Sequence, residues 1–357
     1  MILAHYRLQS PKVIILQNAS FYSSEWLSQN LKSIRGGYDL SEIHDIGRMG
    51  ALCSEESLLF RENHASFGCL PEEMGSVVKF GFHVSISSSI DKAVERAQKL
   101  GCDSFQIFTR NPRSWATKEL GEGEPEAFRA KRAEAGIEPV FGHMPYILNL
   151  ASPERKVYER SVASLGTGLA RCEMLGIPML VTHVGSHLGK GSELGVERVV
   201  DALDIALGGD DSKVMVLLET GPGSRNSVGS SFEEMGRILN SIVDADRVGI
   251  CLDTCHVFAA GYELRTAEGF EETVNSFEVE IGLDRLELVH LNDSVGGFRS
   301  GRDHHEHLGL GEIGLRGLGL VVNSGFGGVP MIMETPINDT RGNLGNMNVA
   351  RGLVGMG

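Results

Sequence analysis

Eight short apolar segments that alternate with helix-like patterns are the strongest constraint on the fold of this chain. Each segment is apolar on both faces, as expected for parallel strands that are covered by helices. Eight strand–helix units in about 250 residues are typical of a (β/α)8 TIM barrel, and a doubly wound open sheet is the competing α/β architecture. The segments are residues 80–85, 104–110, 139–144, 179–184, 215–220, 248–254, 286–293 and 330–335.

The intervening segments carry helix periodicity and helix caps. Ser231 and Glu234 stand three residues apart at the start of one periodic stretch, which predicts a capping box. Residues 313–327 contain several glycines, each of which costs about 1 kcal/mol in a helix interior, so the last barrel helix is expected to be weak. Between the first two strands, apolar residues recur at the spacing of one helix face: Ile90, Ala93, Val94, Ala97 and Leu100.

The chain is expected to divide near residue 79. Residues 1–78 show no sustained period and few apolar runs, so they are expected to build little core of their own. We interpret them as a poorly ordered N-terminal extension, or as an upstream stretch that a start at Met74 would omit, with a small accessory domain as the alternative. Residues 79–357 are then the TIM-barrel domain.

Composition and charge exclude several classes of protein. The chain has 357 residues, 41% of them hydrophobic and 22% charged, which excludes a disordered or collagen-like chain. No apolar run approaches the roughly 18 residues that a membrane span needs, and we find no secretory signal. The six scattered cysteines without a CxxC pair fit a reducing cytoplasm. The net charge of −14 argues against a generic nucleic-acid binder, because phosphate contacts need Lys and Arg.

Seven of the eight predicted strands end in a side chain that can bind a metal. Because the C-terminal ends of barrel strands meet at one face, these side chains are expected to point into one bowl. The second strand breaks the pattern and ends in Thr109, Arg110 and Asn111. Beyond the sixth and seventh strands lie three more candidates, His256, Asp303 and His305. The seven strand-end residues are His83, His143, His183, Glu219, Asp253, His290 and Glu334.

A shared bowl of imidazoles and carboxylates predicts bound cations. Burying such a group without partners would cost free energy. Bound cations would supply the partners, because neutral imidazoles and carboxylates are zinc ligands. The ligand types suit Zn²⁺, with Mn²⁺ as the alternative. Their number exceeds one tetrahedral site, so two or three metals are expected, some of them bridged by a carboxylate. A multi-metal bowl suits phosphoester hydrolysis, because metals activate water and clamp phosphate oxygens.

Longer motifs surround these candidate ligands: HVS, GHMPYILNL, THVGSHLG, LLETGPG, GICLDTCHVFAAGYELRT, VHLNDS, GRDHHEHLGLGEIG and MIMETP. Together they resemble the endonuclease IV family of apurinic/apyrimidinic endonucleases, in the xylose isomerase-like TIM barrel superfamily. The resemblance implies a trinuclear zinc site at the C-terminal face of the strands and a monomeric enzyme of DNA base excision repair. It implies hydrolysis by zinc-activated hydroxide of the phosphodiester 5′ to an abasic site in duplex DNA, leaving a 3′-hydroxyl and a 5′-deoxyribose phosphate.

The resemblance also assigns the candidate ligands to three zinc ions. Glu219 would bridge the first two ions and help to position the hydroxide. His83 is not a ligand in the family, and we expect it to orient a ligand or the phosphate. His304 or His307 could serve as a ligand in place of Asp303 or His305 if the register of this loop slips. The ligands would be His143, His183 and Glu219 for the first ion, Glu219, Asp253, His290 and Glu334 for the second, and His256, Asp303 and His305 for the third.

Three further residues are candidate DNA contacts. In the family, loops after the second and third strands enter the duplex, and Arg113 and Tyr146 match the inserted side chains. A planar side chain there would replace the stacking that is lost when the abasic nucleotide leaves the helix. Trp115 is the third candidate. For Trp115 and Tyr146, simple packing within the loop or at the rim is the alternative.

Two other functions stay open from the sequence. A metal-dependent sugar isomerase or epimerase on the same type of barrel would also use histidines and carboxylates at strand ends, usually around one or two metals. The candidate third site at His256, Asp303 and His305 favours the nuclease. A zinc-binding scaffold without catalysis is the second alternative, and the complete set of ligand positions argues against it.

Overall fold

Eight parallel strands form a closed barrel in the computed structural model, which describes residues 78–356. The strands follow the order β1-β10-β7-β6-β5-β4-β3-β2 around the barrel, so the first and last strands are neighbours. The predicted TIM barrel is confirmed, and the open sheet is excluded. The strands are β1 Phe80–His83, β2 Ser104–Phe108, β3 Val140–His143, β4 Met179–His183, β5 Met215–Glu219, β6 Val248–Asp253, β7 Leu286–His290 and β10 Met331–Met333.

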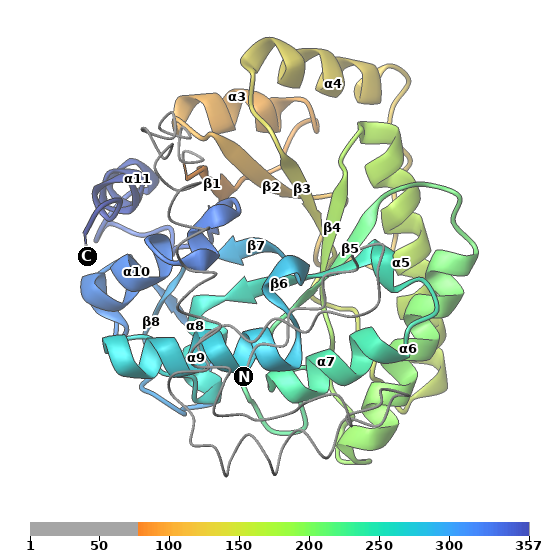
Figure 1. Cartoon of the computed structure of the whole chain (residues 1–357). Helices are drawn as coiled ribbons and strands as arrows, with labels where there is room; N and C mark the ends of the chain where they lie inside the picture. Colours follow the sequence, from red (N-terminus) through yellow and green to blue (C-terminus); the bar gives the residue numbers. More distant parts are fainter. Residues whose placement is uncertain (1–77, 357) are drawn as a thin grey trace, which may run out of the picture. The chain divides into compact units, whose positions relative to one another are not determined.

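Helices form a ring outside the strands (Figure 1). Helical segments connect each barrel strand to the next, β6 is followed by two helices rather than one, and α11 follows the last strand. In the described part of the chain, no helix has the length and apolarity to span a bilayer. The helices are α3 Lys92–Lys99, α4 Glu124–Ala135, α5 Arg155–Leu175, α6 Ser192–Gly208, α7 Phe232–Ser241, α8 Thr254–Ala260, α9 Ala267–Glu280, α10 Gly314–Val322 and α11 Asn343–Gly352.

All eight barrel strands end one to three residues before their predicted ends. The second ends at Phe108 rather than at residue 110, and the seventh shows the largest difference, because it ends at His290 rather than at residue 293. The chain after His290 forms a separate antiparallel ribbon of β8 (Asp293–Ser294) and β9 (His305–Glu306). The predicted extension lies outside the described residues except for residue 78.

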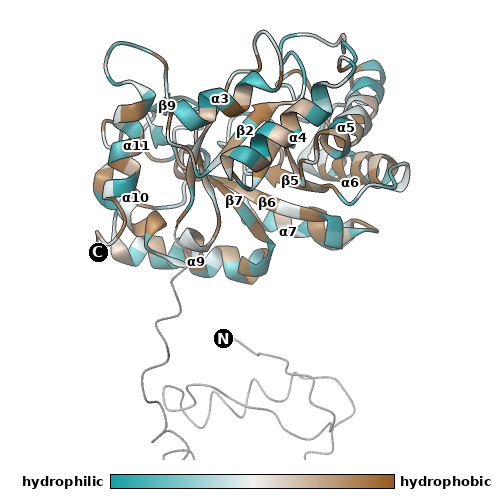
Figure 2. Ribbon diagram, turned by 90° about the horizontal axis from the view of Figure 1, so that it is seen from above, coloured by the Kyte–Doolittle hydropathy of each residue, from teal (hydrophilic) through white to brown (hydrophobic). Residues whose placement is uncertain are grey.

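The apolar core has two layers. The larger layer lies between the strands and the helices, where side chains such as Phe105 and Leu203 are fully buried. Figure 2 shows hydrophobic colour concentrated on the strands and hydrophilic colour on the outer surfaces of the helices. The smaller layer contains one buried residue from each of six strands: Phe141, Val181, Leu217, Cys251, Leu288 and Ile332.

The period of a β-strand places the candidate ligands directly above the smaller layer. Side chains two residues apart point to the same face of a strand. In β5, Leu217 belongs to the inner layer and Glu219 follows two positions later. Leu288 and His290 are related in the same way in β7. The inner apolar layer therefore supports a polar layer at the C-terminal end of the barrel.

The seam between β1 and β2 requires a glycine. A Cβ on Gly81 would lie 1.7 Å from the carbonyl oxygen of Ser104, so no other residue fits without separating the strands. The register at this seam pairs His83 with Gln106, which brings both side chains to the level of the polar layer.

The predicted helix cap at Ser231 is present in altered form. The Ser231 hydroxyl accepts a hydrogen bond from the backbone N–H of Glu234, as in a capping box. The carboxylate of Glu234 accepts from the N–H of Gly229 instead of returning to Ser231. The second half of the motif thus ties the preceding loop to α7.

One buried carboxylate anchors the loop after β9. Asp293 Oδ2 accepts backbone N–H groups from Gly309 at 2.8 Å and from Gly311 at 3.0 Å. Its Oδ1 accepts from Ile313 at 3.0 Å. A Cβ on Gly311 would lie 2.4 Å from the carbonyl oxygen of Ser294, so the loop needs a glycine there. Asp293 therefore connects β8 to the start of α10.

Replacement of Asp293 is expected to destabilise the barrel. Asp293→Ala would leave several buried N–H groups without an acceptor, and each such group costs about 1–3 kcal/mol. We expect the free energy of unfolding to fall by about 3 kcal/mol or more, measured by urea denaturation. Asp284→Ala, at an exposed position, is the control and is expected to change stability by less than about 0.5 kcal/mol. A loss at Asp293 as small as that of the control would contradict the anchoring role.

Removal of residues 1–73 is expected to leave the barrel intact. The barrel closes within the described residues, because β1 pairs with both β2 and β10. A chain that starts at Met74 should keep its thermal midpoint within about 2 °C, which corresponds to about 0.5 kcal/mol. A much larger fall in scanning calorimetry would mean that the extension packs on the barrel.

Candidate metal centre

All nine predicted ligand side chains lie together at the C-terminal ends of the barrel strands, and we call this set the ligand cluster. Five of them are the last residues of β3 to β7, and a sixth directly follows β10. These six side chains therefore face the barrel interior at one level. Three come from α8 and from the loop that contains β9. In chain order they are His143, His183, Glu219, Asp253, His256, His290, Asp303, His305 and Glu334.

The two carboxylate oxygens of Glu219 face different groups of ligands. Glu219 Oε2 lies 3.2 Å from His143 Nε2 and 3.3 Å from His183 Nδ1. The ligand atoms of these three residues lie within 4.8 Å of one another. They form the first group, which matches the predicted ligands of the first ion.

The second group contains the other oxygen of Glu219. Glu219 Oε1 lies 3.1 Å from His290 Nδ1. The same nitrogen lies 3.4 Å from Glu334 Oε2 and 3.8 Å from Asp253 Oδ2. A carboxylate that faces two groups has the arrangement of a bridging ligand, as predicted for Glu219.

The third group contains two buried nitrogen atoms without hydrogen bonds. His256 Nε2 and His305 Nε2 are buried and have no hydrogen-bond partner among the described residues. They lie 3.1 Å and 3.4 Å from Asp303 Oδ1. Buried polar atoms normally have partners, so these nitrogens and Asp303 fit a cation that would accept their lone pairs.

Backbone carbonyl oxygens fix which nitrogen of three histidines faces the cluster. His143 Nδ1 donates to Met144 O at 2.6 Å, and His256 Nδ1 donates to Thr220 O at 2.8 Å. His305 Nδ1 donates to Glu334 O at 3.2 Å. A carbonyl oxygen only accepts, so each Nδ1 carries a proton and each Nε2 is the nitrogen left to bind a cation. Metal-binding histidines are typically oriented in this way.

The charges of the ligand cluster also indicate a demand for cations. Burial would raise the pKa of Glu219, but His183 and His290 lower it well below its usual range. Burial would lower the pKa of His256, but Asp253 and Asp303 raise it to about 10. The carboxylates of the ligand cluster thus hold positive charge near them, which protons supply when no metal is bound. Burial raises the pKa of the Cys255 thiol to about 12, so this neighbouring residue is a poor ligand.

The remaining histidines lie outside the three groups. His83 Nδ1 lies 2.9 Å from Glu334 Oε1, consistent with an orienting role. His304 is exposed. His307 is fully buried, and its ring is bonded to Asn338 and Asn346. The geometry therefore favours Asp303 and His305 over the alternative register of this loop.

Two polar residues of the site were missed by the sequence analysis. The second strand was interpreted as ending in Thr109, Arg110 and Asn111, but its inward residue at the level of the ligands is Gln106, the register partner of His83. The error arose because the strand was expected to extend to residue 110, two residues past its end at Phe108. Asn292 donates to Asp253 Oδ2 at 2.7 Å and accepts from the N–H of Glu334 at 2.8 Å. Counting alternate positions from each strand start could have found Gln106.

The candidate DNA contacts have different surroundings. Tyr146 is 61% exposed, and its ring lies 5.1 Å from that of Phe108 and 5.9 Å from that of His183. Arg113 is exposed. Trp115 is half-buried beneath the guanidinium of Arg160, 4.3 Å from its ring centre, so it packs within the structure as the alternative interpretation has it.

A cavity of about 500 Å³ opens beside the first group of ligands. Tyr146, His183, Glu219 and Asp303 line it, together with loop residues from 184–186 and 221–228. Partial burial at the cavity wall, followed by the carboxylates of Glu334 and Glu219, raises the pKa of Tyr146 to about 12, so its hydroxyl stays protonated at neutral pH. A molecule in this cavity would therefore reach the ligand cluster past the neutral phenol of Tyr146.

Two buried arginines organise the loop that carries Arg113. Arg110 donates to Trp115 O at 3.0 Å and to Thr117 Oγ1 at 2.9 Å. Arg171, from α5, donates to Thr109 O at 2.8 Å and to a second carbonyl of the same loop. Arg110, predicted as part of a strand end, is thus a support for the loop and not part of the ligand cluster.

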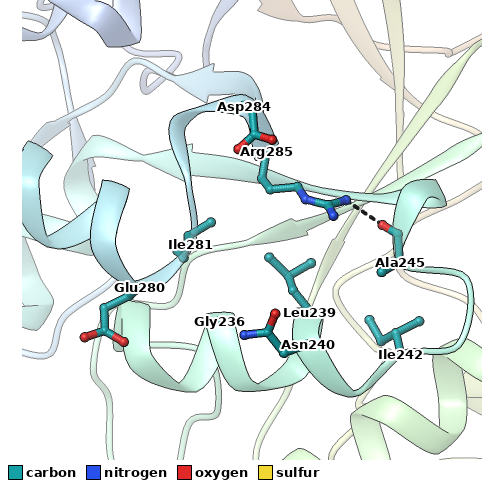
Figure 3. A pocket seen from close by; sticks show the side chains of 9 residues that line it. All are labelled: Gly236, Leu239, Asn240, Ile242, Ala245, Glu280, Ile281, Asp284 and Arg285. Carbon is teal, nitrogen blue, oxygen red and sulfur yellow. Dashed lines mark hydrogen bonds between the residues drawn. The ribbon is translucent and has the colours of Figure 1, made fainter. Parts of the chain in front are cut away.

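A second hollow lies between α7 and the chain that precedes β7. Figure 3 shows its lining, including the bond from Arg285 to the carbonyl oxygen of Ala245, which measures 2.8 Å. Its two carboxylates, Glu280 and Asp284, point away from each other (Figure 3). Neither belongs to any of the potential ligand groups found among the described residues, so this hollow is not a candidate metal centre.

Comparison with known proteins agrees with the fold and the site. Residues 94–350 match a family model described as "Xylose isomerase-like TIM barrel", and this is the class of protein that the barrel and its ligand cluster define. A "Probable endonuclease 4" of Methanoculleus marisnigri is 50% identical over 281 residues, which cover 78% of this chain and 100% of that protein. A homologue from Cenarchaeum symbiosum with the same name is 46% identical over 281 residues, 78% of this chain and 100% of that protein. The chain belongs to the endonuclease IV family.

Solved structures give the same result. The crystal structure of endonuclease IV from Thermus thermophilus is 37% identical, has a TM-score of 0.70, and is matched over 78% of this chain and 100% of that chain. A D-tagatose 3-epimerase-like protein has a TM-score of 0.61 at 21% identity, over 78% of this chain and 97% of that chain. At that identity the epimerase-like protein shares the fold alone.

The number of divalent ions bound per chain is expected to fall by one when a single group of the ligand cluster is disrupted. Asp303 belongs to the third group only, so Asp303→Ala should remove one divalent ion per chain and leave the first two groups occupied. Elemental mass spectrometry of dialysed protein would measure this. Asp246→Ala, in the turn before β6, is the matched control and should keep every ion. An unchanged metal content in the Asp303 variant would show that the third group holds no metal.

Proposed function

We propose that this protein is a zinc-dependent endonuclease that repairs DNA by hydrolysing the phosphodiester 5′ to an abasic site. The products would be a 3′-hydroxyl and a 5′-deoxyribose phosphate. The observation that carries the proposal is the position of Glu219, with one oxygen in each of two ligand groups and a third group beside them. Membership of the endonuclease IV family supports the same activity.

The three groups would hold one zinc ion each. Imidazole nitrogen and carboxylate oxygen are suitable zinc ligands, and the unpartnered nitrogens of His256 and His305 fit such an ion. Zinc ions bound there would lower the pKa of a coordinated water toward about 7 and offset the negative charge of the phosphodiester. The same positive charge would compensate for the acidic character of the chain, which has a net charge of −14.

The rim residues would select the abasic site. Arg113 and Tyr146 are exposed, and both could enter the duplex and replace lost stacking. Extruding a nucleotide costs a few kcal/mol and least where the base is already missing. Tyr146 also lines the cavity beside Glu219, so an extruded sugar would come to rest next to the first two groups.

We infer that residues 79–357 carry this activity and act as a monomer on double-stranded DNA in the cytoplasm. A sugar epimerase is the second candidate, because epimerase-like proteins share the barrel. The third group, formed by His256, Asp303 and His305, favours the nuclease, since one or two metals are usual for the epimerase reaction. Near three zinc ions per chain would therefore support the nuclease.

A duplex with one abasic site tests the proposal directly. The purified chain should nick the abasic strand on the 5′ side and leave the intact duplex uncut, and incubation with a strong chelator should abolish the nick. Product ends can be identified by their extension with a polymerase and by mass spectrometry. Absence of a chelator-sensitive nick by the zinc-loaded protein would end the proposal.

Glu219→Gln is expected to lower the rate of nicking by about a thousandfold or more, because it removes a charged ligand shared by two groups. Glu287→Gln is a matched control, since Glu287 also lies on a barrel strand but lines a hollow outside the ligand cluster. Burial raises the pKa of Glu287, so a neutral amide is expected to be tolerated there with little loss of activity. Equal rates for the two variants would contradict the role of Glu219.

A further inference from the structure

Gln106 is a fully buried polar residue on the inner face of β2, which, like β1, supplies none of the nine ligands. Its side-chain amide contacts three residues of the site at once: His83, His290 and Glu334. We propose that Gln106 is a positioning residue that determines which atoms of His290 and Glu334 face the second metal. The inference rests on the metal centre of the proposed function and assigns a role to a residue that is not a ligand.

The contact with His290 determines the protonation of its ring. Gln106 Oε1 lies 3.0 Å from His290 Nε2. An amide oxygen only accepts hydrogen bonds, so His290 Nε2 carries the proton and Nδ1 presents its lone pair. Nδ1 is the nitrogen that faces Glu219 Oε1 at 3.1 Å and Glu334 Oε2 at 3.4 Å. Backbone carbonyl oxygens do this for His143, His256 and His305, but for His290 the acceptor is a side chain.

The contact with Glu334 selects one of its two oxygens. Gln106 Nε2 donates to Glu334 Oε1 at 2.9 Å. His83 Nδ1 lies 2.9 Å from the same oxygen. Gln106 Nε2 and His83 Nδ1, from β2 and β1, therefore both face Oε1 and leave Oε2 for the second group. The carboxylate is held in one orientation without a direct contact between Gln106 and the metal.

Only a neutral amide meets both requirements at this position. It supplies an acceptor to His290 and a donor to Glu334, whereas an apolar side chain would leave both partners unsatisfied. A carboxylate could accept from His290 Nε2 but would place a further negative charge next to Glu334. The role of Gln106 also explains why β2 can lack a ligand, since its inward position is used to orient ligands from β7 and β10.

Zinc binding by the full-length chain tests this inference. Gln106→Met keeps a similar volume and removes the amide, so the affinity for one of three zinc ions should fall by about 10- to 100-fold, while the other two ions stay bound. Equilibrium dialysis against buffered zinc, followed by elemental mass spectrometry, would measure the affinities. Ser104→Ala is the matched control, because Ser104 lies two residues earlier on β2 and donates to the carbonyl oxygen of Pro139; its zinc affinity should be unchanged.

Proton NMR of the cobalt-substituted protein provides a second readout. The slowly exchanging ring N–H of His290 should be present in the wild-type and Ser104→Ala proteins and should exchange rapidly or vanish in Gln106→Met. Gln106→Glu retains an acceptor for this proton, so it should keep the His290 signal while weakening zinc binding, and it replaces Gln106→Met if that variant does not fold. Unchanged zinc affinity in both variants would overturn the inference. These measurements use no DNA, so a chain that binds three zinc ions but cuts nothing would refute the proposed function alone.

Discussion

The whole site depends on placing a buried carboxylate, Glu219, where its two oxygens contact different sets of imidazoles. Burying a charged carboxylate at the end of a barrel strand costs free energy. The neighbouring histidines stabilise the charged form of Glu219 and thereby lower its pKa. The apolar layer beneath, which includes Leu217, excludes water from one side. The strand ends therefore bring carboxylates and imidazoles together in an arrangement that suits divalent cations.

The strand ends were predictable from the sequence because a parallel strand shows a continuous apolar run that stops at the ligand. His143, His183 and His290 each end such a run, and each is the last residue of its strand. Gln106 was not predictable in this way, because it lies inside its run and the apolar Ile107 and Phe108 follow it. The grouping of the ligands depends on side-chain directions, which no pattern along the chain contains.

The loops were less predictable than the strands. Glu234 was expected to return to Ser231 but accepts from Gly229, since the distance between a loop and a helix start is set by tertiary packing. The role of Asp293, with its N–H donors from Gly309 to Ile313, depends on a chain reversal that a local pattern cannot show. The family resemblance supplied the assignment of Asp303 and His305 over their histidine neighbours, which spacing alone left open.

The seam between the first and last strands has a consequence for biosynthesis. Glu334, directly after the last strand, meets His83 and Gln106, which precede it by 251 and 228 residues. On the ribosome, a nascent chain cannot finish this part of the site until its final strand emerges and docks beside the first. Completion of the ligand cluster and closure of the barrel are thus a single late event, and truncated translation products would lack both.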